Sequence, residues 1–370
     1  MNLLAKTGSW IVALLVIAAT PVFGQNGKAV ADCGNRCVPQ MCCPPKPCCE
    51  EMPKLQLPCA YNAPARIEVK CPWDLYVSAS FTYWQPIQNN MEIGVIATAS
   101  GLAIDGHVKN FNADFEPGFK VGIGMNFDHD SWDSQIVYTW FRGNTSESVK
   151  ADDHSSILPL WSVPSSDDAF GSASERWKLH MDLLDWELGR SYYVGRQLTF
   201  RPFIAVRGAW IRQSVNVDYD VPVVAAAGDL DVHKKSHSWA VGPRMGLATN
   251  WIFCDDFRIF GNGAADILFT RYTSLRSTDE RGGLFPATFA VRQHDYNAIR
   301  PHMELELGFG WGTYLDCYNW YLDFSAGYSF QVFFDQNMFR HFNDALVVNS
   351  VSPNGNLYMQ GLTLTVRVDF

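Results

Sequence analysis

The feature that most constrains this chain is an alternation of apolar and polar residues that begins near Asp74 and recurs to Phe370. Leu362, Leu364 and Val366, for example, are each followed by a threonine or an arginine. A period of two puts successive side chains on opposite faces of a β-strand. Aromatic residues make up 14% of the chain, which also favours strands. About ten such stretches occur, so the sequence predicts an all-β fold.

The predicted connections between these strands alternate between short and long. Tight turns at one end and large loops at the other are typical of outer-membrane barrels. The pattern therefore predicts a transmembrane antiparallel β-barrel of about ten strands, or twelve or more if segment 214–234 or segment 92–111 adds a hairpin. The short connections are 128–130, 192–196, 254–256 and 315–319, and the long ones are 86–114, 143–175, 213–236, 273–298 and 335–356.

Aromatic and glycine residues support the same fold. Tryptophans near strand ends predict an aromatic girdle at the lipid interfaces, although the rim of an ordinary sheet is an alternative explanation. Two glycine-rich faces, around Gly122 and Gly310, are expected to face a wet lumen, because a dry core would leave holes there. The girdle candidates are Trp132, Trp140, Trp177, Trp239, Trp251, Trp311 and Trp320.

The first 24 residues have the pattern of a cleavable signal peptide. Lys6 precedes an apolar run at 11–19, and small residues lie near Gly24. A membrane anchor is the alternative, but the run is far shorter than the roughly 20 apolar residues of a spanning helix. We expect three parts: a signal peptide at 1–24, a Cys- and Pro-rich periplasmic leader at 25–73, and the barrel at 74–370.

Eight of the ten cysteines lie in the leader. Disulfides persist in an oxidising envelope, whereas the spacing does not fit a zinc site and no histidine accompanies these cysteines, so we expect disulfides and no metal. The adjacent pairs at 42–43 and 48–49 cannot all bridge comfortably within so short a loop, which leaves bonds to other chains open. Cys254 and Cys317 fall in predicted short turns, on the same expected periplasmic side as the leader, so we expect them to form disulfides with the leader or with neighbouring envelope proteins. Two unrelated free thiols are the alternative. The leader cysteines are Cys33, Cys37, Cys42, Cys43, Cys48, Cys49, Cys59 and Cys71.

Charged residues on the polar strand faces predict the lining of the lumen. Opposed charges across a constriction would select polar solutes and ions. The alternative is a plugged lumen in which the charges pair with one another, because a ten-stranded barrel is narrow. The predicted lining consists of Lys120, Lys178, Arg201, Arg207, Arg244, Arg258, Arg367, Glu116, Asp182, Asp266, Glu304, Glu306 and Asp323.

Other classes of function have weaker support. The net charge of −9 disfavours nucleic acid, whose phosphates need a basic face. No Gly-x-Ser-x-Gly motif, phosphate-binding loop or dinucleotide fingerprint is present, so we expect neither enzyme activity nor a cofactor. Asp152–Asp153–His154 and His294–Asp295 are the only acid–histidine neighbours in the long loops that suggest a barrel protease or lipase, and adjacency alone is a weak signal.

Several short stretches resemble known outer-membrane proteins. Phe370, with apolar residues at alternate positions before it, resembles the last-strand signal read by the barrel assembly machinery of bacterial outer membranes. Residues 183–190 (LLDWELGR), residues 198–203 (LTFRPF) and Arg207 resemble the Legionella-type major outer membrane proteins, whose family includes barrels of chlamydia-related bacteria.

The resemblance implies an outer-membrane location with the long loops at the cell surface, and porin activity. For the members from chlamydia-related bacteria, the resemblance also implies disulfide cross-links to other Cys-rich envelope proteins. The crowding of cysteines in the leader is a departure from the family pattern, because not every member is expected to have it. The sequence and the resemblance together predict a porin for small polar solutes or ions, embedded in outer-membrane lipid. A surface adhesin or structural protein with a plugged lumen is the alternative, followed by an omptin-like enzyme. A trimer is compatible with a porin, but no residue pattern requires it.

Overall fold

The fold is taken from a computed structural model of the chain. It describes residues 63–70, 73–100, 103–127, 130–152, 154–162, 169–221, 227–253, 256–283, 286–340 and 354–370. No helix in these ranges is long and apolar enough to cross a membrane. The predicted signal peptide, most of the predicted leader, and every predicted disulfide cysteine except Cys317 lie outside the described residues.

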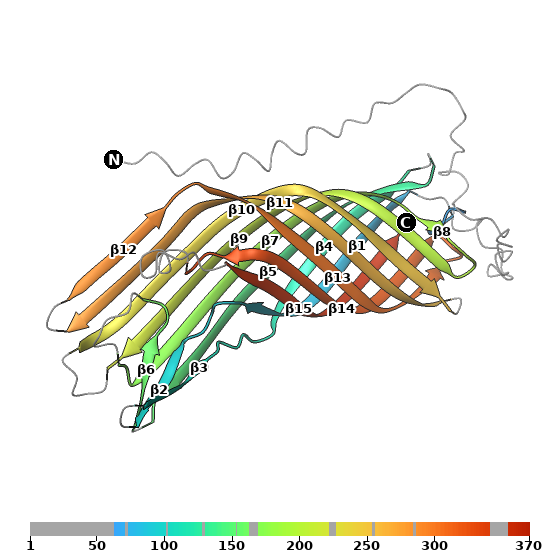
Figure 1. Cartoon of the computed structure of the whole chain (residues 1–370). Helices are drawn as coiled ribbons and strands as arrows, with labels where there is room; N and C mark the ends of the chain where they lie inside the picture. The colour runs from blue at the N-terminus through green and yellow to red at the C-terminus, as the bar shows by residue number, and fades with distance from the viewer. Residues whose placement is uncertain are drawn as a thin grey trace. The chain divides into compact units, whose positions relative to one another are not determined.

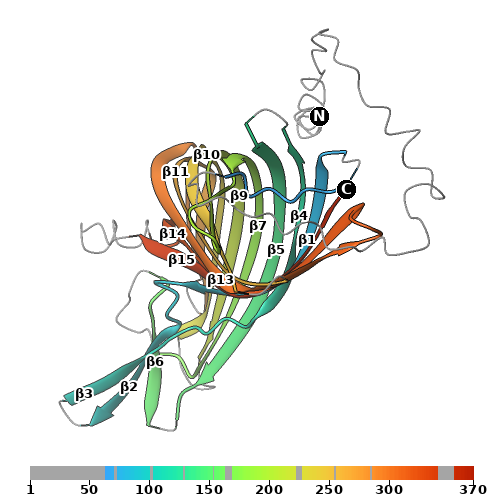
Figure 2. The ribbon, with the colours of Figure 1, turned by 90° about the vertical axis from the view of Figure 1, so that its right-hand side faces the viewer.

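The described residues form a closed antiparallel β-barrel of ten long strands (Figures 1 and 2), which confirms the predicted fold class. Each strand pairs with its neighbours in chain order, and β15 returns to pair with β1, so that Val77 lies opposite Val368. The barrel strands are β1 (Leu75–Gln88), β4 (Glu116–Asn126), β5 (Trp132–Lys150), β7 (Ser172–Arg190), β9 (Leu198–Asp220), β10 (Ala227–Ile252), β11 (Phe257–Gly283), β13 (Tyr296–Leu315), β14 (Trp320–Asn337) and β15 (Gly355–Asp369).

Five shorter strands lie outside this ring. β2 (Gly94–Ser100), β3 (Ala103–Lys109) and β6 (Ser155–Pro159) form a separate three-stranded sheet at one end of the barrel (Figure 2). β12 (Ala287–Gln293) pairs only with the outer part of β11, and β8 (Tyr192–Tyr193) pairs with β9. These strands add hairpins without adding to the barrel wall.

Both places where extra barrel strands were considered have another structure. Residues 92–111 do contain a hairpin, β2–β3, but it joins the small sheet. Residues 214–234 are the far ends of β9 and β10, which pair with each other directly, as Tyr219 does with Leu230. The long connection predicted at 213–236 is therefore wrong, because most of it is strand.

All four predicted short turns join adjacent strands, at residues 127–131, 191–197, 253–256 and 316–319. They lie at one end of the barrel, which we name the turn end. The opposite end, which carries the small sheet and β12, is the loop end (Figure 1). The strands β9, β10 and β11 have 23, 26 and 27 residues. Since a membrane-crossing strand needs about 9–11 residues, these strands continue well beyond a bilayer.

The apolar face of the barrel changes sides partway along its length. In the turn-end half, large apolar side chains point outward, as Leu307 (70% exposed) and Ile204 (64% exposed) do. In the loop-end half they point inward. On β7 the change falls between Leu183, which is buried inside, and Leu184, which starts the outward series. A lipid belt thus surrounds one half, and an apolar core fills the other.

This change of sides corrects two predictions. Trp177 belongs to the interior and is only 2% exposed, so it is not part of an aromatic girdle. Leu179, Met181 and Leu183 share its inward face, so Lys178 and Asp182, which were predicted to line the lumen, lie on the outward face, where water covers this part of the barrel.

Candidate functional site: the barrel interior

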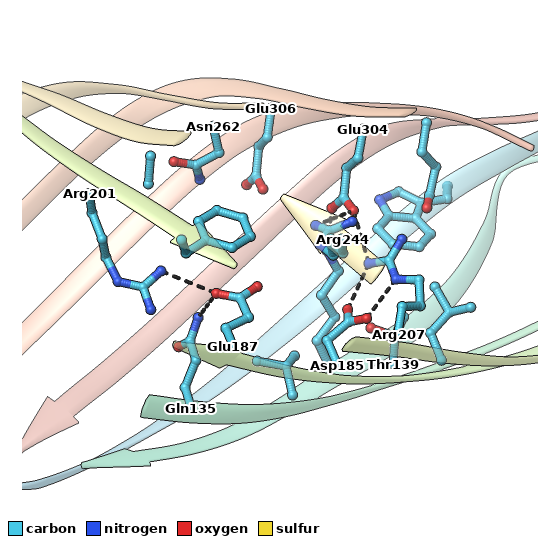
Figure 3. Close-up of a pocket in the computed structure, with 17 residues that line it drawn as sticks. Gln135, Thr139, Asp185, Glu187, Arg201, Arg207, Arg244, Asn262, Glu304 and Glu306 are labelled. Atoms are coloured by element: carbon cyan, nitrogen blue, oxygen red, sulfur yellow. Dashed lines mark hydrogen bonds and ion pairs between the residues drawn. The ribbon is translucent and has the colours of Figure 1, made fainter. Parts of the chain in front are cut away.

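The middle of the interior holds an ion-pair cluster centred on Arg207 of β9 (Figure 3). Its Nε and Nη2 atoms donate to the two carboxylate oxygens of Asp185 on β7, each at 2.6 Å. Its Nη1 lies 3.0 Å from Asp266 Oδ2 on β11, and its Nη2 lies 3.2 Å from Glu304 Oε2 on β13. Two parallel bonds between a guanidinium and a carboxylate are both strong and directional, so Arg207 links one side of the lumen to the other.

Three further side chains complete this central cluster. Arg244 of β10 lies 2.9 Å from Glu304 and 3.2 Å from Asp266. Lys120 of β4 lies 3.6 Å from Glu304, and His302 Nδ1 of β13 lies 2.7 Å from Asp266. The formal charges balance, with three cations facing three carboxylates: Arg207, Arg244 and Lys120 against Asp185, Asp266 and Glu304.

A second group of ion pairs lies nearer the turn end. Arg201 of β9 binds Asp133 of β5 through two of its nitrogens, with Nε 2.9 Å from Oδ2. Its Nη1 also lies 3.1 Å from Glu187 of β7. On the other side of the barrel, Arg258 pairs with Asp323 and Arg367 with Asp369. The polar face of the turn-end half thus consists largely of partnered charges.

A cavity of about 190 Å³ lies between these two groups (Figure 3). Arg201, Glu187 and Gln135 lie on one side of it, and Arg207 and Glu304 on the other. Lys120, Asn262, Glu306 and Gln331 also line it. The space has room for several water molecules, each of which needs about 30 Å³, and its walls offer both donors and acceptors.

The interior of the loop-end half has a different lining. Trp177 and Leu179 of β7 and Val215 and Val217 of β9 are each no more than 2% exposed. They pack in one continuous cluster that reaches Trp161, which follows the small sheet in the chain. Side chains packed to this extent leave no room for a column of water. Among the described residues, this apolar core, together with buried polar side chains such as Lys234, Ser236 and Ser238, leaves little exposed interior surface beyond the central cluster.

Residues 63–70 form a strap at the turn end. The N–H of Tyr193 donates to the carbonyl of Ala63 at 2.8 Å, and the N–H of Ala65 donates to that of Ser191 at 3.1 Å. At the other end, the N–H of Lys70 donates to the carbonyl of Tyr318 at 2.7 Å. The strap therefore links the turn between β7 and β9 to the turn between β13 and β14.

The family model of the Legionella pneumophila major outer membrane protein precursor matches residues 68–370, which is the whole barrel. The chain belongs to this family. As a Legionella-family major outer membrane protein, it is an outer-membrane β-barrel protein, as the resemblance implied. No curated protein matches the chain.

The solved structures that match the chain include a protease, a FadL homologue and a toluene transporter. The outer membrane protease OmpT of Escherichia coli is 10% identical over 82% of this chain and 99% of its own, with a TM-score of 0.39. A Pseudomonas aeruginosa FadL homologue (9% identity, 80% and 90% coverage) has a TM-score of 0.27. The Pseudomonas putida toluene transporter TodX (10%, 80% and 89%) has a TM-score of 0.30.

The interior of this Legionella-family barrel contains most of the residues predicted for the lumen. All but two of those predictions fall on inward-facing strand positions, and Glu306 lines the cavity. The exceptions are Lys178 and Asp182, which point outward. Asp182 lies opposite Trp140 on the outer face and accepts hydrogen bonds from Arg142 and Tyr138. The predictions for Lys178 and Asp182 are wrong for the same reason as the prediction for Trp177. Each assumed that β7 keeps its apolar side chains on the lipid-facing side along its whole length.

Several interior residues were missed in the sequence. Asp185 and Glu187 follow Leu184, where the alternation restarts with Trp186 and Leu188 outward. A period-two search restarted at that point would have found both carboxylates. Asp133 and His302 carry the same signal, because Asp133 shares a period-two face with Gln135 and Thr139, and His302 precedes Glu304 and Glu306 on theirs.

The glycine-rich faces do not border open water. A side chain at Gly310 would meet the Arg258 guanidinium at 2.6 Å, and one at Gly124 would meet the ring of Tyr76 at 2.2 Å. The glycines leave room for large neighbours that fill the interior. Neighbouring side chains therefore fill the holes that a dry core would leave at these positions, so these glycines do not indicate a wet lumen.

The acid–histidine neighbours of the loops form no catalytic arrangement among the residues described. Asp295 binds Arg271 at 2.7 Å, whereas His294 Nδ1 lies 3.2 Å from the Thr273 carbonyl oxygen. The two side chains of this pair thus contact different partners. Asp153 of the other candidate lies outside the described residues. Within the described part of the chain, no group of three histidine, cysteine or acidic side chains could hold a metal.

Proposed function

We propose that this protein is a closed-lumen barrel that serves as a structural and surface component of the outer membrane. The observation that carries this proposal is the filled interior, with the apolar core in the loop-end half and the central cluster below it. An open porin needs a continuous aqueous path, and outer-membrane pores are lined by polar side chains throughout. A plugged lumen also suits the narrow bore of a ten-stranded barrel.

The orientation is part of the proposal. Outer-membrane barrels have short turns in the periplasm and long loops outside, so the turn end is periplasmic and the loop end extends from the cell surface. The outward polar faces of β7, β9 and β10 at the loop end support this, because they lie beyond the lipid belt. The small sheet of β2, β3 and β6 then forms the exposed tip, which suits a surface adhesin.

A porin for small polar solutes or ions is the second candidate. The polar cavity favours it, because Lys120, Glu306, Gln135 and Asn262 would offer both charges and hydrogen bonds to a passing solute. Conduction would require the apolar core above the cavity to part.

Single-channel recording separates the two candidates. The full-length mature protein is refolded, its folding is checked by heat-modifiable mobility on gels, and it is added to a planar bilayer. The closed-lumen proposal predicts no stable conductance steps. Steps whose ion preference shifts in Glu306→Gln, but not in the exterior control Glu280→Gln, would establish the porin instead. Glu306 suits this test because it lines the cavity and takes no part in the central cluster.

Cross-linking of the envelope through the leader cysteines and recognition of Phe370 by the assembly machinery are further parts of the proposal. Phe370 supports the second role by its position, since its backbone pairs with Leu75 and its ring contacts Trp73 and Trp320 where β1 and β15 meet. A free C-terminal strand would expose this group before the barrel closes.

A further inference from the structure

The outer face of the loop-end half carries a compact basic surface. It lies on four adjacent strands, β7, β9, β10 and β11 (Figure 1), whose pairing places outward side chains in rows across the wall. Three successive rows hold eight basic residues and no carboxylate. From the lipid belt outward they are His180, Arg212, His237 and Ser274; then Lys178, Ser214, Lys235 and Arg276; then Arg176, Asn216, His233 and Thr278.

These charges have no acidic partners of their own. Among the described residues, none of the five lysines and arginines in the three rows forms an ion pair. A groove of about 420 Å³ opens over the second and third rows, where five basic side chains line it with Ser214, Asn216 and Thr278, and one carboxylate, Glu280 of the next row, lies at its edge. Arg276 Nε donates to Thr278 Oγ1 at 3.2 Å, which leaves its two terminal nitrogens for another acceptor. The groove thus concentrates hydrogen-bond donors and positive charge.

The rows start directly beside the lipid belt. Trp210 and Trp239 lie opposite each other in the row just below, and Trp210 is 42% exposed. Exposed tryptophans in such a row mark the level of the membrane interface. Two residues along a strand advance about 7 Å, so the first two basic rows lie at the depth of the lipid headgroups.

The row above the basic surface has the opposite charge. Asp218, Asp231 and Glu280 lie side by side on β9, β10 and β11. A soluble polyanion approaching from outside would meet these carboxylates first. A headgroup that is already in the membrane reaches the basic rows from the lipid side, where the carboxylate of Asp182, in the row of Trp210, is bound by Arg142. The sequence of charges along the barrel therefore favours a membrane lipid over a soluble ligand.

We propose that this basic surface binds the phosphate groups of anionic glycolipid headgroups in the outer leaflet. The guanidinium groups match a phosphate with two parallel hydrogen bonds, and the lysines add charge. This inference rests on the proposed orientation, in which the loop end is external, and is independent of whether the lumen conducts.

Lipid binding by the full-length folded protein tests the proposal. Native mass spectrometry measures the affinity for a glucosamine-disaccharide glycolipid with two phosphates and for the same lipid without phosphate. We expect Lys178→Gln, Lys235→Gln and Arg276→Gln together to weaken binding of the phosphorylated lipid at least tenfold and to leave the other lipid unaffected. The control removes three cations elsewhere, at Lys109, Lys150 and Arg190, and should change neither affinity.

Two results would overturn the proposal. One is an equal loss of affinity for the phosphorylated lipid in both triple variants, or no loss in either variant, with folding verified by heat-modifiable mobility. The other is preferential binding of a soluble sulphated polysaccharide that the phosphorylated lipid fails to displace, which would make the surface a receptor for soluble polyanions. Conductance of the wild-type protein would contradict the closed lumen and leave these affinities unchanged, so the two failures are distinguishable.

Discussion

Arg207 and Asp185 form a two-fold hydrogen-bonded pair inside the barrel, with both N–O distances at 2.6 Å and the arginine side chain 2% exposed. Removing one member of a buried pair leaves the other charge without compensation, which costs about 3–5 kcal/mol. We expect Arg207→Gln to lower the free energy of unfolding by that amount in urea titrations of the protein in lipid vesicles. Arg190→Gln, which breaks the exposed pair with Asp130, should cost no more than about 1 kcal/mol. Equal costs would show that the central cluster does not hold the barrel together.

The change of sides on β7 predicts opposite environments for two tryptophans nine residues apart. Trp186 is 60% exposed on the lipid-facing side, whereas Trp177 is buried in the interior. In vesicles of brominated lipid, which quench nearby tryptophans, Trp186→Phe should reduce the quenched fraction of the fluorescence. Trp177→Phe should remove emission that the brominated lipid does not reach. If Trp177→Phe reduced the quenched fraction instead, Trp177 would face lipid, and the level assigned here to the lipid belt would be wrong.

Glu175 of β7 gives the loop-end core a pH dependence. It lies beyond the lipid belt and is 1% exposed, and this burial raises the pKa of its carboxyl to about 9, although Arg340 opposes the shift. An unfolded glutamate has a pKa near 4.3, so between roughly pH 4.3 and 9 the folded state holds the proton more tightly. The stability from this group is complete below that window and is lost as the pH rises through it.

Glu175→Gln should therefore raise the free energy of unfolding at pH 8 and flatten its fall between pH 6 and pH 8.5. The wild-type slope has an upper limit of about 1.4 kcal/mol per pH unit for one proton. Unfolding titrations at a series of pH values measure it, with Glu280→Gln on the exposed surface as the control. An unchanged slope in Glu175→Gln would mean that Glu175 is ionised in the folded core.

The strap suggests one disulfide bond between the leader and the barrel. The hydrogen bond from Lys70 to Tyr318 joins two residues whose chain neighbours are Cys71 and Cys317. Each cysteine is thus one peptide bond from this backbone contact of 2.7 Å. Cys71 itself lies outside the described residues.

We expect peptide mapping of the native envelope protein without reductant to recover Cys71 linked to Cys317. Cys317→Ser should abolish that peptide and free Cys71 for bonds to other chains, which non-reducing gels would show as additional high-mass bands. Cys254→Ser is the matched control from another short turn. Recovery of Cys317 as a thiol in the oxidised envelope would exclude the bond.

The sequence was sufficient for the architecture because lipid imposes a simple pattern. Period two, short turns and even strand number follow from the need to satisfy every backbone group in the membrane, and the structure has the ten strands that they predict. The small sheet was foreseen only as a hairpin at 92–111, because its third strand, β6, comes from a different connection. Its partner could not be predicted from local periodicity.

The interior was less predictable. Alternation identifies which side chains share a face, but it does not tell whether that face meets lipid, water or a core. On β7 the same inward face carries Trp177 above and Glu187 below, and only the level of the membrane explains the difference. The pairing of Arg207 with Asp185 depends on register between strands, which a single sequence does not specify.

The seam between β1 and β15 also governs how the barrel forms. Val77 and Val368 are opposite each other although 291 positions (368 − 77) separate them. Contacts of such long sequence separation form late, because a long loop must close before they are made. The first strand synthesised thus waits for the last, and until then β1 presents an unpaired edge to other chains. Closure is therefore the step at which this barrel is most exposed to wrong partners during biogenesis.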